Sequence, residues 1–223
     1  MATSRFLVLV LSVVPTFTGC ASVLGIEQAT HDSRLDKGGA GNGGNANAGA
    51  GGGGASGKTL CETYCDTVGA NCTDTNEQYE SRAVCLRACS RLEDGQPGDD
   101  IGNTVQCRLH YAESAASAGE AAGNCSVAGP GGAQLDNPNI CGTYCDGLCT
   151  LALDTCKGAN FRFTSLSECK AACEALPDLG NYNDSIIEGN SVQCRLYHVS
   201  AAQIDPIIHC PHVGGDVGPC KIP

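Results

Sequence analysis

The order of apolar and polar positions marks the start of the chain as distinct from the rest. Residues 6–14 (FLVLVLSVV) form a short apolar segment, with the positive charge of Arg5 before it and small residues after it. This pattern is typical of a secretory signal, and it predicts that residues 1–19 are a signal peptide. The segment is too short to span a bilayer as a stable helix, which needs about 20 apolar residues.

A glycine-rich stretch separates this segment from the remainder. Residues 38–57 are nearly all Gly, Ala and Asn. Such a stretch cannot bury enough apolar surface to offset its ordering entropy, so it is typical of a flexible linker. We therefore expect residues 20–57 to be a tether that carries the folded part of the protein.

The junction between these segments resembles a known processing site. Residues 17–20, Phe-Thr-Gly-Cys, resemble the lipobox of bacterial lipoproteins, although Phe17 stands where an aliphatic residue is usual. The resemblance implies that Cys20 is diacylated, becomes the mature N-terminus and anchors the chain in a membrane. Ala21 and Ser22 follow without an Asp, which by the same resemblance implies the outer membrane. The alternative is an ordinary secretory signal that leaves Cys20 as a free thiol.

Beyond residue 58 the pattern repeats. The motif Cys-x-Thr-Tyr-Cys occurs at residues 61–65 and 141–145, and the blocks GNTVQCRLHY (102–111) and GNSVQCRLYH (189–198) nearly coincide. The sequence therefore predicts two tandem Cys-rich repeats, residues 58–136 and 137–223. Arg108 and Arg195 recur in these blocks, and we expect them to form salt bridges with acidic loops.

The spacing of polar and apolar positions within each repeat indicates helices. Cys61, Cys65 and Cys72 fall on one stripe of an ideal helix. Ser165 and Glu168 form the pattern of a capping box before a run of good helix formers. Thr104 and Ser191 are expected to cap a third helix in each repeat, over residues 105–118 and 192–203, with Asp205-Pro206 ending the later one. The fold class expected is all-α, small and disulfide-rich, with each repeat built on a helical hairpin plus a third helix.

Composition supports a disulfide framework. The chain has 17 Cys, 4% aromatic residues and no Trp, so a conventional aromatic core is excluded and cross-links are expected in its place. Removing Cys20 from 17 leaves an even number that can pair completely. The net charge of −11 excludes nucleic acid as a partner, because a phosphate backbone requires a basic face.

Two antiparallel helices that each carry Cys-x-x-x-Cys can be joined by two bridges, an arrangement that resembles the disulfide-stapled helical-hairpin peptides. This predicts one pair of bridges in each repeat and assigns the remaining cysteines to a third helix, to the C-terminal end and to a link between repeats. Connectivity does not follow from spacing alone, so other pairings stay open. The predicted bridges are Cys61–Cys89, Cys65–Cys85, Cys72–Cys107, Cys141–Cys173, Cys145–Cys169, Cys156–Cys194, Cys210–Cys220 and Cys125–Cys149.

The second repeat carries the candidate metal ligands. His198, His209 and His212 could bind Zn or Cu through their imidazoles, or they could be surface residues beside a disulfide. The first repeat has no equivalent histidines around Cys125. No Cys-x-x-Cys motif, nucleophile elbow or recognisable catalytic arrangement occurs.

The lipobox, linker and repeats together resemble the Cys-rich lipoproteins of uncharacterised function found in some Gram-negative soil bacteria. The resemblance implies location and architecture only. The expectation is a non-catalytic module, lipid-anchored in the cell envelope, that has no cofactor and binds an unknown protein or glycan. The alternative is a metal or redox accessory protein that uses the histidines of the second repeat.

Overall fold

The computed structural model describes residues 58–117, 119–160, 162–214 and 218–221, all within one compact unit that spans residues 53–223. The predicted signal peptide, the lipidation site at Cys20 and the linker lie outside the described residues. The regular secondary structure of the described residues is helical, with isolated bridges between single residues in the loops, which confirms the predicted all-α, disulfide-rich fold class. None of its helices has the length and apolar character needed to cross a membrane.

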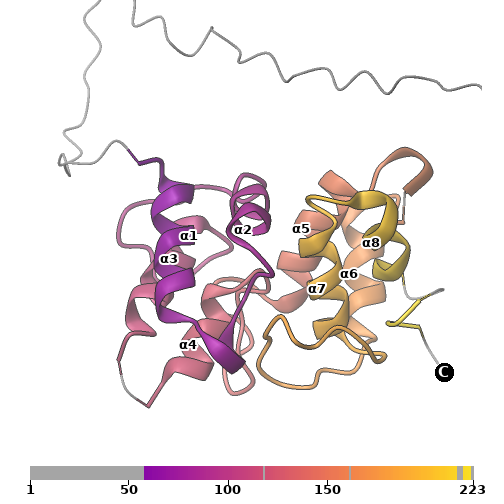
Figure 1. Cartoon of the computed structure of the whole chain (residues 1–223). Coiled ribbons are helices and arrows are strands. Elements are labelled where there is room, and N and C mark those ends of the chain that lie inside the picture. The colour runs from indigo at the N-terminus through magenta and orange to yellow at the C-terminus, as the bar shows by residue number, and fades with distance from the viewer. Residues whose placement is uncertain (1–57, 118, 161, 215–217, 222–223) are drawn as a thin grey trace, which may run out of the picture. The chain divides into compact units, whose positions relative to one another are not determined.

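Each repeat contains four α-helices and one short 3-10 helix in the same order (Figure 1). The sequence predicted three helices in each repeat; the fourth is an addition. The first repeat comprises α1 (Leu60–Asn71), η1 (Asp74–Asn76), α2 (Arg82–Cys89), α3 (Val105–Ser114) and α4 (Ala121–Ala128). The second comprises α5 (Tyr144–Thr155), η2 (Gly158–Asn160), α6 (Leu166–Glu174), α7 (Val192–Ala201) and α8 (Pro206–Val213).

Side-chain caps set the starts of these helices. Thr104 and Ser191 cap α3 and α7 as predicted, and each accepts a hydrogen bond from the third backbone N–H of its helix. Ser165 caps α6, but the Glu168 carboxylate bonds the backbone N–H of Thr164 and not that of Ser165. The predicted capping box is therefore only half formed.

The ends of the third helices differ from the prediction. Both are shorter than predicted, because α3 ends at Ser114 and α7 at Ala201. Asp205 and Pro206 do not end α7. The Asp205 side chain accepts from the backbone N–H of Ile208 and so begins α8, with Pro206 in the first turn, where its missing N–H costs no helical hydrogen bond. The Asp-Pro pair is thus a start signal, and this sharp turn carries the chain from α7 into α8.

The described residues contain eight disulfides, and the connectivity is identical in the two repeats. The first repeat has the predicted Cys61–Cys89 and Cys65–Cys85 bridges, which join α1 to α2. The other six predicted bridges are wrong. The structure has in their place Cys72–Cys125, Cys107–Cys141, Cys145–Cys173, Cys149–Cys169, Cys156–Cys210 and Cys194–Cys220.

The physical reason for the error is the register of the repeat. Cys141 lies before Thr143, the N-cap of α5, so Cys141 is outside the helix and cannot share the helical face that pairs with α6. Cys145 and Cys149 occupy that face, so the predicted bridges Cys141–Cys173 and Cys145–Cys169 are both displaced by one helical turn.

The remaining corrections follow from the same register and from the fourth helix. In each repeat, this helix supplies the partner for the cysteine that caps the first helix, so Cys72 pairs with Cys125 and Cys156 with Cys210. These two bridges replace the predicted Cys72–Cys107, Cys156–Cys194 and Cys210–Cys220. The third-helix cysteines pair with the last cysteine of each repeat instead, Cys141 and Cys220. Cys125 is bonded within its own repeat, so the predicted inter-repeat bridge Cys125–Cys149 does not exist.

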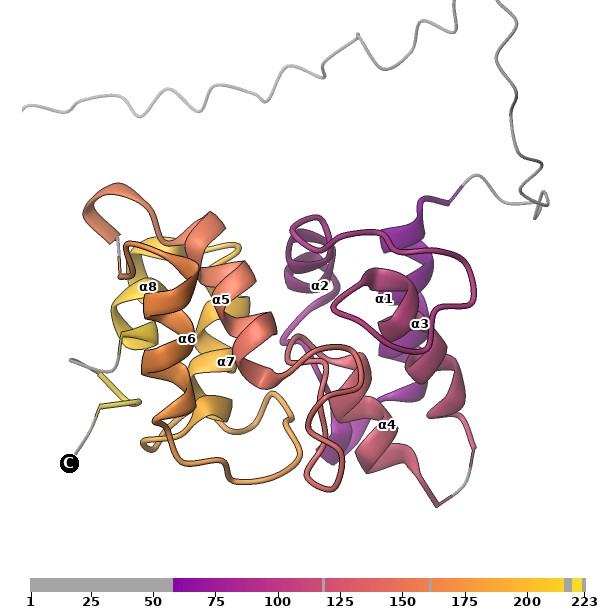
Figure 2. The same ribbon diagram turned by 180° about the vertical axis from the view of Figure 1, so that it is seen from behind.

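These bridges also define the repeat unit. Cys107–Cys141 crosses the predicted boundary between residues 136 and 137, so Cys141 closes the first repeat. Below, the first repeat means residues 60–141 and the second repeat means residues 144–220. One buried cluster lies within the first repeat, and the cluster of the second repeat also takes in Ala88 and Ala133 of the first. Both clusters contain several buried cystines. The four helices of each repeat group together in both views (Figure 1, Figure 2).

Polar contacts of buried groups join the two repeats. The Ser126 hydroxyl on α4 lies 2.9 Å from the Tyr144 hydroxyl on α5, and it accepts a hydrogen bond of 2.8 Å from the backbone N–H of Tyr182. The helix α5 approaches the first repeat closely at Gly147, where any Cβ would overlap the carbonyl oxygen of Pro130. Ser126, Tyr144 and Tyr182 are all buried, so this contact is part of the protein interior.

Arg108 has a structural role, but not the predicted one. Its guanidinium is fully buried and donates to the carbonyl oxygens of Gly129, Thr104 and Pro130 and to the side-chain oxygen of Asn103. Among the described residues, Arg108 forms no ion pair with an acidic loop. Arg195 in the second repeat makes the corresponding bonds to the Ser191 carbonyl and the Asn190 side chain. In both repeats the arginine therefore binds the N-cap carbonyl and a neighbouring asparagine at the start of the third helix.

Candidate metal-binding site

The three histidines predicted as ligands come together between α7 and α8. His198 lies in the last turn of α7, and His209 and His212 lie three residues apart on α8, where that spacing places them on neighbouring positions of one face. The short turn capped by Asp205 folds α8 back against α7. The Cys156–Cys210 bridge ties α8 to the end of α5, so the two histidines that flank Cys210 are held in place covalently.

The geometry brings three ring nitrogens of one kind to one point. The Nδ1 atom of His198 lies 2.9 Å from Nδ1 of His209 and 3.3 Å from Nδ1 of His212. Each of the three side chains offers a potential ligand atom within 4.8 Å of the other two. His198 is buried, whereas His209 and His212 are partly exposed. The cluster therefore has one inner and two outer imidazoles.

A backbone carbonyl orients the inner imidazole. Nε2 of His198 lies 3.1 Å from the carbonyl oxygen of Ile187, which can only accept a hydrogen bond. Nε2 therefore carries the proton in the neutral ring, and the lone pair of Nδ1 is directed toward His209 and His212. Metal-binding histidines use this arrangement, because a hydrogen bond at the second nitrogen fixes the tautomer and the ring orientation.

The environment favours the neutral, ligand-competent form of this ring. The pKa of His198 is lowered to about 4, chiefly by burial; the Ile187 carbonyl opposes the shift, and the neighbouring His212 and His209 add to it. Burial also lowers the pKa of His212, with His209 as the second cause. At neutral pH the inner imidazole is therefore uncharged, as a metal ligand must be.

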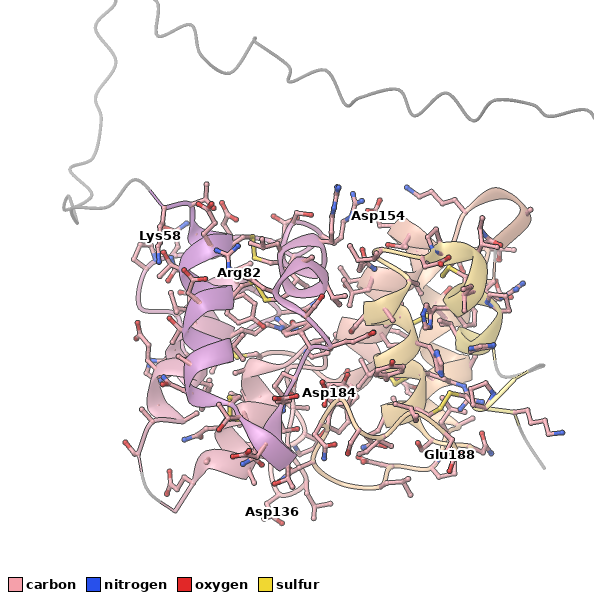
Figure 3. All side chains as sticks on the ribbon, in the orientation of Figure 1. Lys58, Arg82, Asp136, Asp154, Asp184 and Glu188 are labelled. Carbon is pink, nitrogen blue, oxygen red and sulfur yellow. A yellow bond between two sulfur atoms is a disulfide. The ribbon has the colours of Figure 1, made fainter. Side chains whose placement is uncertain are left out.

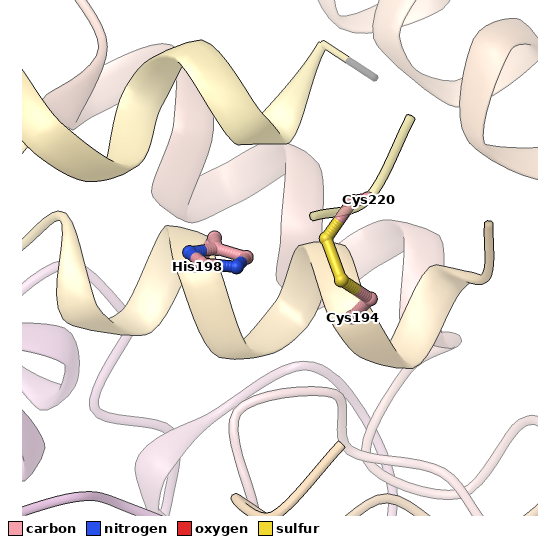
Figure 4. Close-up of side chains that lie close together, drawn as sticks. All are labelled: Cys194, His198 and Cys220. Atoms are coloured by element: carbon pink, nitrogen blue, oxygen red, sulfur yellow. A yellow bond between two sulfur atoms is a disulfide. The ribbon is translucent and has the colours of Figure 1, made fainter. Parts of the chain in front are cut away.

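A disulfide lies directly beside the inner histidine. Cys194 is one turn before His198 on α7, and its bridge to Cys220 places both sulfurs next to the imidazole (Figure 4). Because the sulfurs are bonded to each other, they are not thiolates, and thiolates are what soft metal sites require. Cys210, between the outer histidines, is also oxidised, as predicted for the cysteine at this position, although its partner is Cys156. The donor set is therefore nitrogen only.

The C-terminal segment packs against the cluster. The bridge to Cys220 and a hydrogen bond from the Gly189 N–H to the Pro219 carbonyl (2.9 Å) hold this segment on the second repeat. Gly218 lies so close to the ring of His212 that a Cβ there would overlap it. Sequence reasoning missed Gly218 and Ile187, because Ile187 contributes a backbone atom and Gly218 contributes the absence of a side chain.

The first repeat has no such site. In the register defined by the disulfides, Tyr111, Asn124 and Val127 stand where the second repeat has His198, His209 and His212. Neither a phenol nor an amide nor an alkyl group in those positions makes an imidazole cluster. The site is thus a property of the second repeat and not of the shared fold.

Comparison with known proteins finds a similarity in the second repeat. A family model described as the BfoA family C-terminal domain matches residues 137–222, which include the whole histidine cluster and the four bridges of the second repeat. No curated protein and no solved structure matches the chain.

Proposed function

We propose that this protein is a lipid-anchored module of the bacterial cell envelope whose second repeat binds one divalent transition-metal ion through His198, His209 and His212. The observation that carries the proposal is the convergence of three Nδ1 atoms around a ring whose tautomer is fixed from behind by the Ile187 carbonyl. Surface histidines beside a disulfide would not need that arrangement.

The distances suit a small metal ion. Zn²⁺ binds imidazole nitrogen at about 2.0–2.1 Å, so two nitrogens of a tetrahedral site lie about 3.3 Å apart. The Nδ1 atoms of His198 and His212 are already 3.3 Å apart, and those of His198 and His209 are 2.9 Å apart. A small rotation of the His209 ring would bring the second distance to the value of a tetrahedral site. A nitrogen-only donor set favours Zn²⁺ or Cu²⁺ over the soft Cu⁺ ion.

The fold supports a role outside the cytosol. Eight disulfides among the described residues require an oxidising compartment, and the predicted signal peptide and Cys20 anchor would deliver the chain to the envelope, with the outer membrane as the expected destination. The proposal is more specific than the expectation of a protein or glycan partner, because potential ligand atoms of the three histidines already lie within 4.8 Å of one another. The fourth position on the metal would be left to water or to an external ligand.

The test is metal binding by the chain with Cys20→Ser, which keeps all the disulfides and avoids lipid. We expect one equivalent of Zn²⁺ or Cu²⁺ by elemental analysis after dialysis. We also expect a rise in unfolding free energy of about 2.7 kcal/mol when free metal is 100 times the dissociation constant. His209→Gln, at a partly exposed ligand, should weaken binding by about tenfold or more.

His110→Gln is the matched control, because His110 is an exposed histidine on α3 of the first repeat and is not a member of the histidine cluster. It should leave metal affinity unchanged. Absence of stoichiometric metal, or equal affinity in the His209→Gln and His110→Gln variants, would show that the proposal is wrong.

A further inference from the structure

A glycine in the first repeat lies inside a helix, where glycine is unfavourable, and no close neighbour requires it there. Gly69 lies inside α1, where glycine destabilises a helix by about 1 kcal/mol relative to alanine. Two other glycines inside helices, Gly123 and Gly147, are explained by close neighbours, because a Cβ would overlap Gln134 in one case and the Pro130 carbonyl in the other. Apart from the adjacent residues and the backbone of α1 itself, no atom lies within 4 Å of a Cβ built on Gly69.

The space next to Gly69 is part of a cavity. A hollow of about 350 Å³ lies between α1 and the segment that leads into α2, and Gly69 is one of the residues that line it. Ligand sites in proteins have volumes of about 300–1,000 Å³. The counterpart of Gly69 in the second repeat, 84 residues further along as for Cys61 and Cys145, is the half-buried Leu153. The second repeat has a large side chain where the first repeat has open space.

The lining of the cavity defines its electrostatic character. Asp66 is already neutralised, because Lys58 and Arg82 contact its two oxygens at 2.5 and 2.6 Å (Figure 3). Glu77 and Glu80 also line the cavity, and among the described residues neither of them forms an ion pair with a basic side chain. The pKa of Asp184 is raised chiefly by burial and then by the charges of Glu77 and Glu80, so both carboxylates lie close enough to act on Asp184.

An aromatic ring completes the lining. Tyr79 lies between Gln78 and Glu80 in the wall of the cavity, and its hydroxyl is held 2.8 Å from the Tyr64 hydroxyl. A fixed tyrosine ring flanked by uncompensated carboxylates favours cations, because the face of the ring attracts positive charge. The volume admits a group with an aliphatic stem rather than a bare ion.

We propose that the cavity beside Gly69 binds an ammonium group on an aliphatic stem, with Glu77 and Glu80 as the counter-charges and Tyr79 as the aromatic contact for the ammonium. Gly69 keeps the cavity open at the expense of helix stability. The ligand chemistry is that of a free polyamine or of a lysine side chain on a partner protein. This site is independent of the metal site, which lies in the other repeat.

The experiment measures the binding of two probes, spermidine and a blocked Gly-Lys-Gly peptide, to the full chain with Cys20→Ser by titration calorimetry. Gly69→Leu places the second repeat's residue in the cavity. We expect it to weaken binding of the probes by about tenfold or more while the unfolding temperature stays the same or rises, because leucine is the better helix former. Binding of spermidine alone would identify a free polyamine, and binding of both probes a lysine side chain.

Two further variants separate the site from general attraction to an acidic protein. Glu77→Gln with Glu80→Gln should weaken binding, whereas Asp136→Asn with Glu188→Gln, which removes the same charge from two exposed positions that do not line the cavity, should not (Figure 3). The inference is overturned if neither probe binds, if Gly69→Leu binds as the parent chain does, or if the two charge pairs weaken binding equally.

Discussion

The disulfide scheme predicts that bridges of the same kind contribute unequally to stability. Cys72–Cys125 joins residues separated by 53 positions, and the other bridges shorten this loop in the unfolded chain only slightly. Loop closure then makes the bridge worth about 4 kcal/mol. Cys65–Cys85 spans 20 positions but lies inside Cys61–Cys89. When Cys65–Cys85 is removed, the outer bridge still connects these two positions in the unfolded chain through roughly eight residues, so the inner bridge contributes only about 2.5 kcal/mol.

The perturbation is a pair of double alanine variants, Cys72→Ala with Cys125→Ala and Cys65→Ala with Cys85→Ala. All four cysteines are buried, so the loss of side-chain packing is similar and largely cancels in the comparison. We expect the first variant to lose about 1.5 kcal/mol more unfolding free energy than the second. Because the chain has no Trp, denaturant unfolding is followed by far-ultraviolet circular dichroism.

The second repeat supplies the matched control. Cys156–Cys210 spans 54 positions in the same scheme, so its removal should lower stability by the same amount as removal of Cys72–Cys125. If the nested bridge proves to be worth as much as the long one, closure of loops in the unfolded chain is not the source of the stabilisation.

Three further predictions follow from buried groups. Gly147→Ala should lower the unfolding free energy by about 3 kcal/mol, because its Cβ would overlap the Pro130 carbonyl where the repeats meet; thermal unfolding measures this, and an unchanged midpoint would contradict the close approach. Arg108→Lys should lower the unfolding free energy by about 2–4 kcal/mol in denaturant titrations, because an ammonium cannot reproduce the guanidinium fork to four oxygens; a neutral effect would contradict this. Since the pKa of His198 is lowered from 6.5 to about 4, the unfolded chain takes up the proton first. The metal-free chain should therefore lose stability as the pH falls from 6.5 to 4 and show no further loss from this group below 4, and a His198→Leu variant should lack that dependence.

Local features of the fold could be predicted from the sequence. The caps at Thr104 and Ser191 depend on residues within one helical turn. The two bridges between α1 and α2 depend on pairs of cysteines one turn apart on each helix, where spacing decides which side chains share a face. The histidine cluster could also be predicted from the sequence, because His209 and His212 are one turn apart on the same helix. The orienting contact from Ile187 was not, since a backbone carbonyl has no sequence signal.

The register predicted for the second repeat was wrong because it rested on the alignment of two similar Cys motifs and not on the alignment of the two helix N-caps. Residues 61–65 and 141–145 share Cys-x-Thr-Tyr-Cys, but the helix starts differ. Thr59 with Glu62 and Thr143 with Asp146 are both capping boxes, and these are also 84 residues apart. Alignment on the helix starts would have excluded Cys141 from α5 and corrected the two hairpin bridges that were displaced by one turn. The pairing of the third-helix cysteines with Cys141 and Cys220 depends on long-range packing, which spacing does not encode.

The two-repeat disulfide scheme has a consequence for proteolysis. The bridges of the first repeat overlap from Cys61 to Cys141, and those of the second overlap from Cys145 to Cys220, so a single cut inside either range leaves the fragments covalently joined. Between Cys61 and Cys220, only the connection from Cys141 to Cys145 lacks such a cross-link. In this connection Gly142 and Tyr144 are buried, and the Thr143 N–H is hydrogen-bonded to Asp146. The fold therefore shields from proteases the short segment at which a single cut would separate the two repeats.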